Sequence, residues 1–476
     1  MKLISYLLLL YCLFALPAYP QIGIGGQPHP SAVLDLKSPA NDKAFYPPRL
    51  TTAQRKAIAN PQVGAFVYDL DQSTFYVCDG QNWLPLVPTT PDNIAPIDRI
   101  ASDGAAFDDF GSSVAISGDY AIIGASYKTI GSNGYQGAAY VFVRSGGTWI
   151  EQARLTANDG AATNRFGISV AISGDYAIVG ASGKTIGSNS GQGAAYVFVR
   201  NGSNWIQQAQ LTANDGAAGD SFGTSVAISG DYVLIGASGD NVASYANLGA
   251  AYVFVQSGGI WTQQAKLAAD DGAANDDFGT SVAISGDYAI VGAYSNGFFG
   301  AVNQGSAYVF VRNGSNWTQQ TKLSHNGAAD DFFGGSVAIS GNYAIVGAYG
   351  KTVGSNSDQG AAYVFVRSGT NWTYQAQLTA SDGAAGDYFG TSVAISGDYV
   401  LVGAYKKRVG GTIGQGAVYI FKRNGTTWPQ LRAVTDKSPA YTGNGVGVGL
   451  SNGSYIIGGP GFDNGKGKVS FGILDN

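Results

Sequence analysis

The sequence predicts an all-β protein whose main part is a seven-bladed β-propeller of four-stranded antiparallel blades. Phe-Gly pairs recur every 56 residues, with one spacing of 55, at Phe110, Phe166, Phe222, Phe278, Phe333 and Phe389. Each unit holds four short β-rich runs bounded by turn residues and shows no helical 3.6-residue periodicity. A unit of this kind buries its apolar face only by stacking on its neighbours. Four strands per unit are the content of a propeller blade.

The four predicted strands of the first unit follow one another at residues 110–117, 120–125, 137–144 and 149–155. A Gly-Asp pair separates the first two runs and is typical of a tight hairpin. A Ser-Gly-Gly turn separates the last two, and a variable loop joins the second to the third. Because strand direction alternates, the loops between strands 2 and 3 and those between strand 4 and the next unit share one face. We call it the long-loop face.

A seventh, divergent unit ends the chain one strand short. It has Asn444-Gly445 in place of Phe-Gly, followed by strands predicted at 455–459 and 466–473. The segment 97–103 resembles the fourth-strand segment 152–159 but has no blade before it. We expect this N-terminal strand to complete the last blade and close the ring, which removes the open sheet edges. The predicted propeller spans residues 96–476.

The repeats resemble the FG-GAP repeat family, which includes the β-propeller of integrin alpha subunits. Phe110-Gly111 corresponds to the FG element, and Gly124-Ala125-Ser126 corresponds to the GAP element. The resemblance implies a propeller fold and a calcium loop of the Asp-x-Asp-x-Asp-Gly kind between the first two strands. This chain has only residues 117–120, Ser-Gly-Asp-Tyr, at that place. Since calcium takes about six to eight oxygen ligands, we expect no cofactor there.

Three further segments precede the predicted propeller. Residues 1–20 carry an apolar run behind Lys2 and are typical of a secretory signal peptide. The protein is therefore predicted to be secreted or displayed on the outer cell surface, without membrane insertion after cleavage. Residues 21–87 form a small mixed module that resembles one found on secreted and surface proteins of Bacteroidota-type bacteria. Residues 88–95 are a predicted linker, and Cys78 is the one cysteine expected after cleavage, which excludes an intrachain disulfide.

The composition of the chain argues against several classes of function. Charged residues are 12% of the chain, about half of the ~25% found in an average domain. The net charge of -5 argues against nucleic acid or an anionic membrane as partner. The histidines, His29 and His325, have no nearby cysteine or second histidine with which to form a metal or nucleophile constellation. We expect no enzymatic activity, and a hydrolase is the least favoured function.

The long-loop face carries the candidate binding residues, because binding residues concentrate on loops held by a rigid scaffold. Acidic pairs recur there around a glycine, at Asp103 and Asp108, Asp215 and Asp220, Asp271 and Asp276, and Asp382 and Asp387. They either cap the turn or bind a cation such as calcium or sugar hydroxyls. Asparagine at one position of two other pairs favours capping. The variable loops supply the candidate ligand contacts Lys128, Lys184, Tyr245, Phe298, Phe299, Lys351, Lys406 and Arg408.

These observations predict a binding or adhesion module that engages an extracellular protein or a glycan through the long-loop face. Near-identical blades suggest several weak equivalent sites, and multivalent contact raises avidity without new chemistry. Two alternatives stay open at this stage. One is a lectin-like multivalent sugar binder with sites between blades, and the other is a structural surface component without a ligand.

Overall fold

The computed structural model describes residues 22–24, 34–36, 48–59, 61–63, 65–71, 74–86, 96–242, 247–296, 303–325, 327–435 and 442–474. The chain divides into two compact units, Met1–Thr90 and Pro91–Asn476. The predicted signal peptide and linker lie outside the described residues. Within the described ranges, no helix is long and apolar enough to cross a membrane.

In its described residues, the N-terminal unit combines two small sheets with one short helix. Strands β1 (Ile22–Ile24) and β2 (Leu34–Leu36) pair in parallel. A second sheet has the order β3 (Arg49–Leu50), β4 (Phe66–Asp69), β5 (Thr74–Cys78) and β6 (Trp83–Leu86). Helix α2 (Thr52–Lys56) starts with a capping box at Thr51, and its Arg55 forms a buried ion pair with Asp69 at 2.8 Å. Cys78 is a free, buried thiol.

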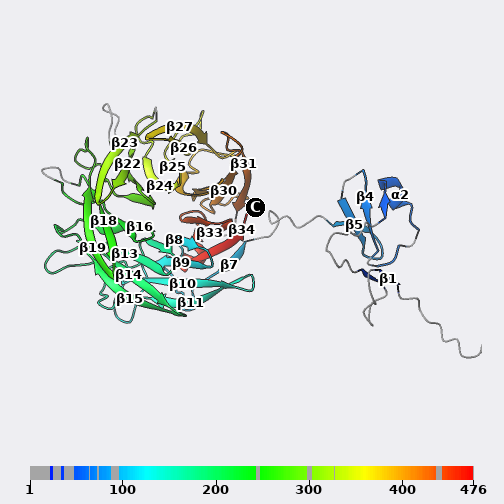
Figure 1. Cartoon of the computed structure of the whole chain (residues 1–476), viewed down its shortest axis with the longest axis horizontal. Helices are drawn as coiled ribbons and strands as arrows, with labels where there is room; N and C mark the ends of the chain where they lie inside the picture. The colour runs from blue at the N-terminus through cyan, green and yellow to red at the C-terminus, as the bar shows by residue number, and fades with distance from the viewer. Residues whose placement is uncertain are drawn as a thin grey trace, which may run out of the picture. The chain divides into compact units, whose positions relative to one another are not determined.

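The second unit is all-β: its described residues form seven four-stranded antiparallel sheets that fit a β-propeller (Figure 1). Sheet 1 consists of β8 (Val114–Ser117), β9 (Tyr120–Ala125), β10 (Ala138–Ser145) and β11 (Thr148–Leu155). Sheet 2 consists of β12 (Val170–Ser173), β13 (Tyr176–Ala181), β14 (Ala194–Asn201) and β15 (Asn204–Leu211). Sheet 3 consists of β16 (Phe222–Ser229), β17 (Tyr232–Ala237), β18 (Ala250–Ser257) and β19 (Ile260–Leu267).

The remaining sheets repeat this pattern. Sheet 4 consists of β20 (Ser281–Ser285), β21 (Tyr288–Ala293), β22 (Ser306–Asn313) and β23 (Asn316–Leu323). Sheet 5 consists of β24 (Phe333–Ser340), β25 (Tyr343–Ala348), β26 (Ala361–Ser368) and β27 (Asn371–Leu378). Sheet 6 consists of β28 (Phe389–Ser396), β29 (Tyr399–Ala404), β30 (Ala417–Lys422) and β31 (Gln430–Thr435). Sheet 7 consists of β32 (Val448–Ser451), β33 (Ser454–Gly459), β34 (Lys468–Ile473) and β7 (Ile97–Arg99), with the short helix α3 (Phe462–Gly465) between β33 and β34.

Sheet 7 joins the two ends of the second unit. Strand β7 pairs antiparallel with β34, with Arg99 opposite Val469 and Ile97 opposite Phe471. The carboxylate of Asp98 accepts a hydrogen bond from the Lys468 ammonium at 2.9 Å. Strand β32 contacts β28 of sheet 6 and β8 of sheet 1. The segment at residue 97 therefore supplies the fourth strand that the last sequence unit lacks.

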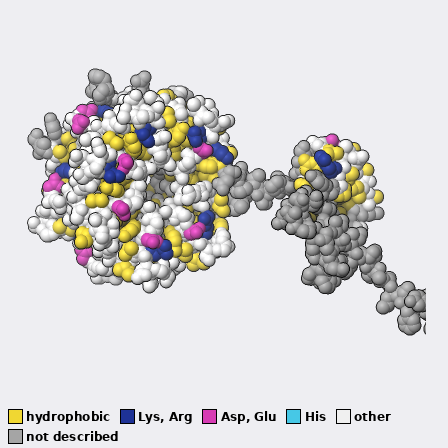
Figure 2. All heavy atoms as spheres, in the orientation of Figure 1, with side chains coloured by type: hydrophobic (Ala, Val, Ile, Leu, Met, Phe, Trp, Pro, Cys, Tyr) yellow, Lys and Arg dark blue, Asp and Glu magenta, His cyan; other side chains and the backbone are white. Residues whose placement is uncertain are grey.

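The first strands of the sheets lie innermost. A central cavity of about 280 Å³ is lined by residues from all seven sheets, including Val114, Val170, Val226, Val282, Val337, Val393 and Val448. Outside this lining, the phenylalanine of each Phe-Gly pair is buried. Phe166, for example, is fully buried and packs on Tyr196 at 5.5 Å and Phe198 at 6.0 Å between ring centroids. Figure 2 shows charged side chains as isolated spots on a mostly uncharged surface, as the low charge content predicts.

Adjacent sheets touch through pairs of glycines. A Cβ on Gly180 of sheet 2 would overlap the carbonyl oxygen of Gly223 in sheet 3, and Ser169 donates a hydrogen bond to the same oxygen at 2.8 Å. The same approach joins Gly124 to Gly167, Gly236 to Gly279, Gly292 to Gly334, Gly347 to Gly390, Gly403 to Gly445 and Gly458 to Gly111. The last pair joins sheet 7 to sheet 1. The glycine of each Phe-Gly pair, and Gly445 of the Asn-Gly pair, thus packs against the penultimate residue of the second strand of the preceding sheet.

Gly180→Ala tests this contact. We expect it to lower the free energy of unfolding by about 3 kcal/mol, because the added methyl group meets backbone that cannot move without separating two sheets. Gly174→Ala is the matched control, since its φ is +56° but a Cβ there meets nothing within 4 Å. The control should lower the free energy of unfolding by about 1 kcal/mol, because a residue with a Cβ is strained in the left-handed region. Equal losses in urea denaturation would contradict the close-contact explanation.

Candidate ligand-binding face

The long connections of each sheet lie at one end of its strands. In sheet 1 the hairpin between β8 and β9 is tight, with Ser117 opposite Tyr120, as is that between β10 and β11, with Ser145 opposite Thr148. Residues 126–137 join β9 to β10, and residues 156–169 join β11 to β12. Antiparallel pairing places both long connections on the same face. The recurring acidic pairs are on this face.

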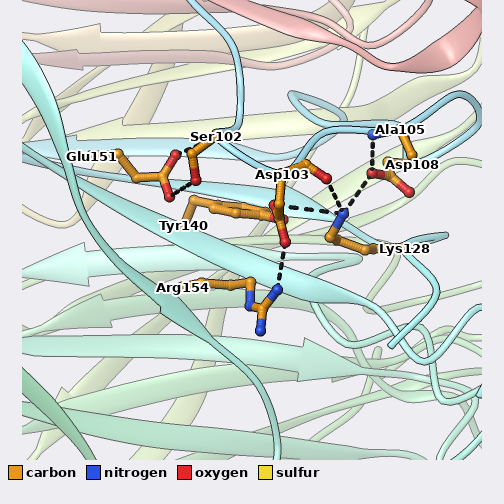
Figure 3. Close-up of polar contacts among 8 residues, drawn as sticks. All are labelled: Ser102, Asp103, Ala105, Asp108, Lys128, Tyr140, Glu151 and Arg154. Carbon is orange, nitrogen blue, oxygen red and sulfur yellow. Dashed lines mark hydrogen bonds and ion pairs between the residues drawn. The ribbon is translucent and has the colours of Figure 1, made fainter. Parts of the chain in front are cut away.

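The acidic pair of sheet 1 encloses a lysine of the chain itself (Figure 3). The Lys128 ammonium donates to the Asp108 carboxylate at 2.8 Å and to the Asp103 carbonyl at 2.7 Å. The side chains of Lys128 and Asp108 are each 7% exposed. The Tyr140 hydroxyl donates to the Asp103 carboxylate at 2.6 Å, whose other oxygen pairs with Arg154. An ammonium group therefore sits where a metal ion would be held by these two carboxylates.

The second acidic residue also caps its own turn. Asp108 accepts the Ala105 N–H at 2.7 Å, and Asn164 makes the equivalent bond to Ala161 at 2.9 Å. The same bond is found at Asp220, Asp276, Asp331 and Asp387. An asparagine oxygen accepts this bond as a carboxylate does, which explains the exchange of Asp and Asn between units.

The ammonium group is supplied from one of two positions. Lys184 in sheet 2 and Lys407 in sheet 6 take the loop position of Lys128, with ammonium-to-carboxylate distances of 2.9 Å to Asp159 and 2.9 Å to Asp387. In sheets 3 and 4 the loop position holds Asp240 and Asn296 instead. There the ammonium comes from the fourth strand, where Lys266 reaches Asp215 and Lys322 reaches Asp271, both at 2.7 Å. We call these internal lysine–aspartate ion pairs the internal lock. The sequence analysis did not predict the internal lock, although the exchange of lysine between the two positions can be read from the repeats.

The lock shifts the ionisation of the first aspartate in each pair. Burial by itself raises the pKa of Asp103, but hydrogen bonds from Tyr140 and Arg154 and the charge of Lys128 bring that pKa below its usual value. The pKa values of Asp159, Asp215, Asp271 and Asp382 are lowered by the corresponding balance. These carboxylates are ionised in the folded protein near neutral pH.

The residues at the family's calcium position do not fit calcium. Asp119 in the first hairpin accepts a hydrogen bond from the Arg144 guanidinium at 2.8 Å. Asp175, Asp287 and Asp398 pair in the same way with Arg200, Arg312 and Arg423. One arginine-paired carboxylate per turn does not supply the ligands that calcium needs. Across the described part of the chain, no group of three or more His, Cys, Asp or Glu side chains is placed to hold a metal ion.

The candidate loop residues differ in their exposure and in the groups that they contact. Lys128 and Lys184 are buried in ion pairs and Lys351 is mostly buried beside Asp331, so their ammonium groups are engaged within the protein. Tyr245, Phe298 and Phe299 lie outside the described residues. Arg408 is exposed. The Lys406 ammonium lies 4.2 Å from the Tyr388 ring centroid.

Lys406 adjoins a series of aromatic rings across sheets 4 to 6. We call it the aromatic arc and define it as Tyr294, Phe332, Tyr349, Tyr388 and Tyr405, all half-buried. Successive ring centroids are 6.1, 4.9, 6.2 and 5.8 Å apart. Sequence reasoning missed the arc, but a signal existed: the residue after each second-strand Gly-Ala is serine in units 1 to 3 and tyrosine in units 4 to 6.

Two known families match different parts of the chain, and the two matches meet at residues 98–100, beyond the division of the compact units after Thr90. A family described as FG-GAP repeat matches residues 100–142, 149–198, 205–254, 261–310, 317–365 and 372–421. A second family, described as phage tail like trimerisation region, matches residues 21–98. No curated protein matches the chain.

Lys128→Met tests the internal lock. Removing one partner of a buried ion pair leaves an uncompensated charge, so we expect a loss of about 3 kcal/mol in the free energy of unfolding at pH 7. Lys406→Met removes a lysine from the same face that lies on an aromatic ring, and should cost about 0.5 kcal/mol or less. Similar losses for both variants in denaturant titrations would argue against the lock.

The lowered pKa values of the first aspartates determine how the stability of the protein changes with pH. A carboxyl whose pKa is lowered by folding stabilises the protein above its unfolded pKa, about 3.9, and that contribution is lost as pH falls through the folded value. The melting temperature should therefore drop below about pH 4. The deficit of Lys128→Met should shrink in the same range, because the variant lacks the charge that lowers the Asp103 pKa. A deficit that stays constant from pH 7 to pH 3 would contradict this assignment.

Proposed function

This chain belongs to the FG-GAP repeat family, and from that premise we propose that it is an extracellular module that binds a glycan through the aromatic arc on its long-loop face. FG-GAP repeats suggest an extracellular binding or adhesion propeller, and the family is typically non-enzymatic. The ligand class, the site and the assembly are the parts that we propose here.

The aromatic arc is the observation that carries the proposal. Five half-buried rings follow one another without a break on the loop face, and contiguous apolar surface of this kind is typical of binding sites on soluble proteins. Sugar rings have apolar faces that stack on aromatic rings. Burial and the neighbouring tyrosines raise the pKa of Tyr349 to about 12, so its hydroxyl stays a neutral donor and acceptor.

We also propose that the seven sheets form a closed seven-bladed ring. The glycine contact between Gly458 and Gly111 repeats, at the junction of sheet 7 with sheet 1, the contact found at the six other junctions. Pairing of β7 with β34 supports the same conclusion. A closed ring holds the arc rigidly, because each of its sheets is braced on both sides.

The N-terminal unit is proposed to assemble three copies of the chain. Residues 21–98 match the phage tail like trimerisation region. Leu70 and Phe75 on this unit are 42% and 40% exposed, which is high for large apolar side chains of a small sheet. A trimer would carry three aromatic arcs, which would raise its avidity for a repetitive glycan without any new contact.

Substitutions that restore the serine of units 1 to 3 test the arc. Tyr349→Ser with Tyr405→Ser should weaken retention on a glycan array by about tenfold or more, equivalent to about 1.4 kcal/mol. Tyr135→Ser removes an aromatic ring that is 52% exposed at sheet 1, and it serves as the matched control with unchanged retention. Undiminished glycan binding by the double variant, with an unchanged melting temperature, would remove the arc from the binding site.

Light scattering tests the assembly. We expect the full chain to have three times the mass of one copy, and Leu70→Asp with Phe75→Asp to reduce it to one copy, because buried unpaired charges oppose association. Gln81→Asp places the same charge at an exposed polar position of this unit and should leave the trimer intact. A monomeric wild-type chain at micromolar concentration would refute the trimer.

A further inference from the structure

Sheet 5 departs from the other sheets at three neighbouring positions of its sequence unit. The unit is one residue shorter: His325 alone stands where the other units have two residues, an Ala followed by Ser, Asn or Asp. Asn326, which lies outside the described residues, is at the first acidic position. In the fourth strand it has Tyr374, where the other units have Glu151, Gln207, Gln263, Gln319 and Gln430. A pocket of about 410 Å³ lies at these positions, lined by Ser324, His325, Lys351, Tyr363, Tyr374 and Gln377.

Sheet 2 shows what the same donors bind when the aspartate is present. The Asp159 carboxylate accepts the Tyr196 hydroxyl at 2.8 Å and the Gln210 amide at 3.2 Å. The Lys184 ammonium lies 2.9 Å from the same carboxylate. Lysine, tyrosine and glutamine at these three positions therefore form a binding site for a carboxylate.

The same three side-chain types line the pocket of sheet 5. Lys351 corresponds to Lys184, Tyr363 to Tyr196 and Gln377 to Gln210. The counterparts of Tyr363 in five other sheets each donate a hydroxyl hydrogen bond to the first aspartate of their unit. The sequence provides an amide, at Asn326, instead of a carboxylate at this position.

His325 adds a buried polar group that is open to the pocket. Its side chain is 6% exposed, and its Nε2 lies 3.3 Å from the Asp331 carboxylate. Neither Nδ1 nor Nε2 has a hydrogen-bond partner among the described residues. The imidazole is held in place by stacking on Phe333, with centroids 4.7 Å apart. An unsatisfied buried nitrogen costs free energy unless a bound group or water meets it.

We propose that this pocket binds the carboxylate group of an acidic sugar, such as a uronic acid. The inference rests on the proposed glycan-binding function and names the chemistry of one residue of that glycan. The ligand carboxylate would accept hydrogen bonds in the pocket from Lys351, Tyr363 and Gln377, as Asp159 accepts them from the counterparts of these residues in sheet 2.

One lysine can serve two carboxylates at such a site. In sheet 6 the Lys407 ammonium lies 2.9 Å from Asp387 and 3.4 Å from Asp382. Lys351, already 3.0 Å from Asp331, would serve Asp331 and the ligand in the same way. The arrangement needs no metal ion.

A sugar ring fits better than a free acidic peptide because of Tyr374. Its side chain remains 56% exposed at the pocket, beside Tyr363 at 6.3 Å between ring centroids. An exposed flat ring next to a carboxylate site is suited to stack on the sugar that carries the carboxylate. The volume lies in the range of about 300–1,000 Å³ that is usual for small-ligand pockets.

Calorimetric titration of the full chain with glucuronate, glucose and N-acetylaspartate tests the proposal. We expect glucuronate to bind at least about tenfold more tightly than either other probe. Tyr374→Gln and His325→Ala restore residues that other units carry, so they should fold, and each should weaken glucuronate binding by about tenfold. Gln207→Tyr places tyrosine at the equivalent position of sheet 2, which keeps Asp159, and should leave the affinity unchanged.

Three results would overturn the pocket assignment. They are equal binding of glucose, equal binding of N-acetylaspartate, or glucuronate affinity unchanged by both restoring variants while their melting temperatures match the wild type. The glycan array distinguishes failure of the pocket assignment from failure of the proposed function. If glycan binding is lost in the Tyr349→Ser, Tyr405→Ser variant but does not depend on the presence of a uronic acid in the glycan, only the pocket assignment is wrong. If the protein binds no glycan on the array, the proposed function itself is wrong.

Discussion

The close approach of paired glycines between adjacent sheets is the constraint on which the rest of this structure depends. A side chain on either partner of a pair such as Gly180 and Gly223 would force the sheets apart. Both glycines belong to short sequence signatures, Phe-Gly and Gly-Ala, whose other residues fill the core beside them. Because the contact recurs at each junction, the loops are displayed at fixed intervals on one face. A rigid face of this kind can differ from sheet to sheet without loss of the fold.

The acidic pairs illustrate how that face is stabilised from within. In sheets 1, 2 and 6 a loop lysine neutralises the aspartates, and in sheets 3 and 4 a fourth-strand lysine does the same. The residues that first suggest a cation site are thus partners of the protein's own ammonium groups. Sheet 5 keeps Lys351 and its tyrosine but has asparagine at the first acidic position. The sheet at the centre of the aromatic arc is therefore also the one whose first acidic position holds an amide instead of a carboxylate.

Much of the fold was readable from the sequence because period, turn residues and strand patterning agreed. The Phe-Gly spacing gave the FG-GAP assignment, and the similarity of segments 97–103 and 152–159 pointed to the strand that β34 pairs with. The site was harder to read, because a loop lysine looks the same in sequence whether it is exposed or buried. The variable loops predict ligand contacts for Lys128 and Lys184, yet both ammonium groups are engaged in ion pairs within the protein. The arc was missed because its members come from two different loops in three units, and their proximity depends on sheet packing.

The central claim is that one sector of the loop face, over sheets 4 to 6, binds the ligand. Hydrogen–deuterium exchange of the full chain, with and without a uronic-acid oligosaccharide, tests it most directly because every loop is observed at once. The account predicts slower exchange confined to peptides covering residues 294–296, 324–363 and 374–408. Equal protection of the corresponding loops in all seven sheets, or protection confined to sheets 1 to 3, would contradict it.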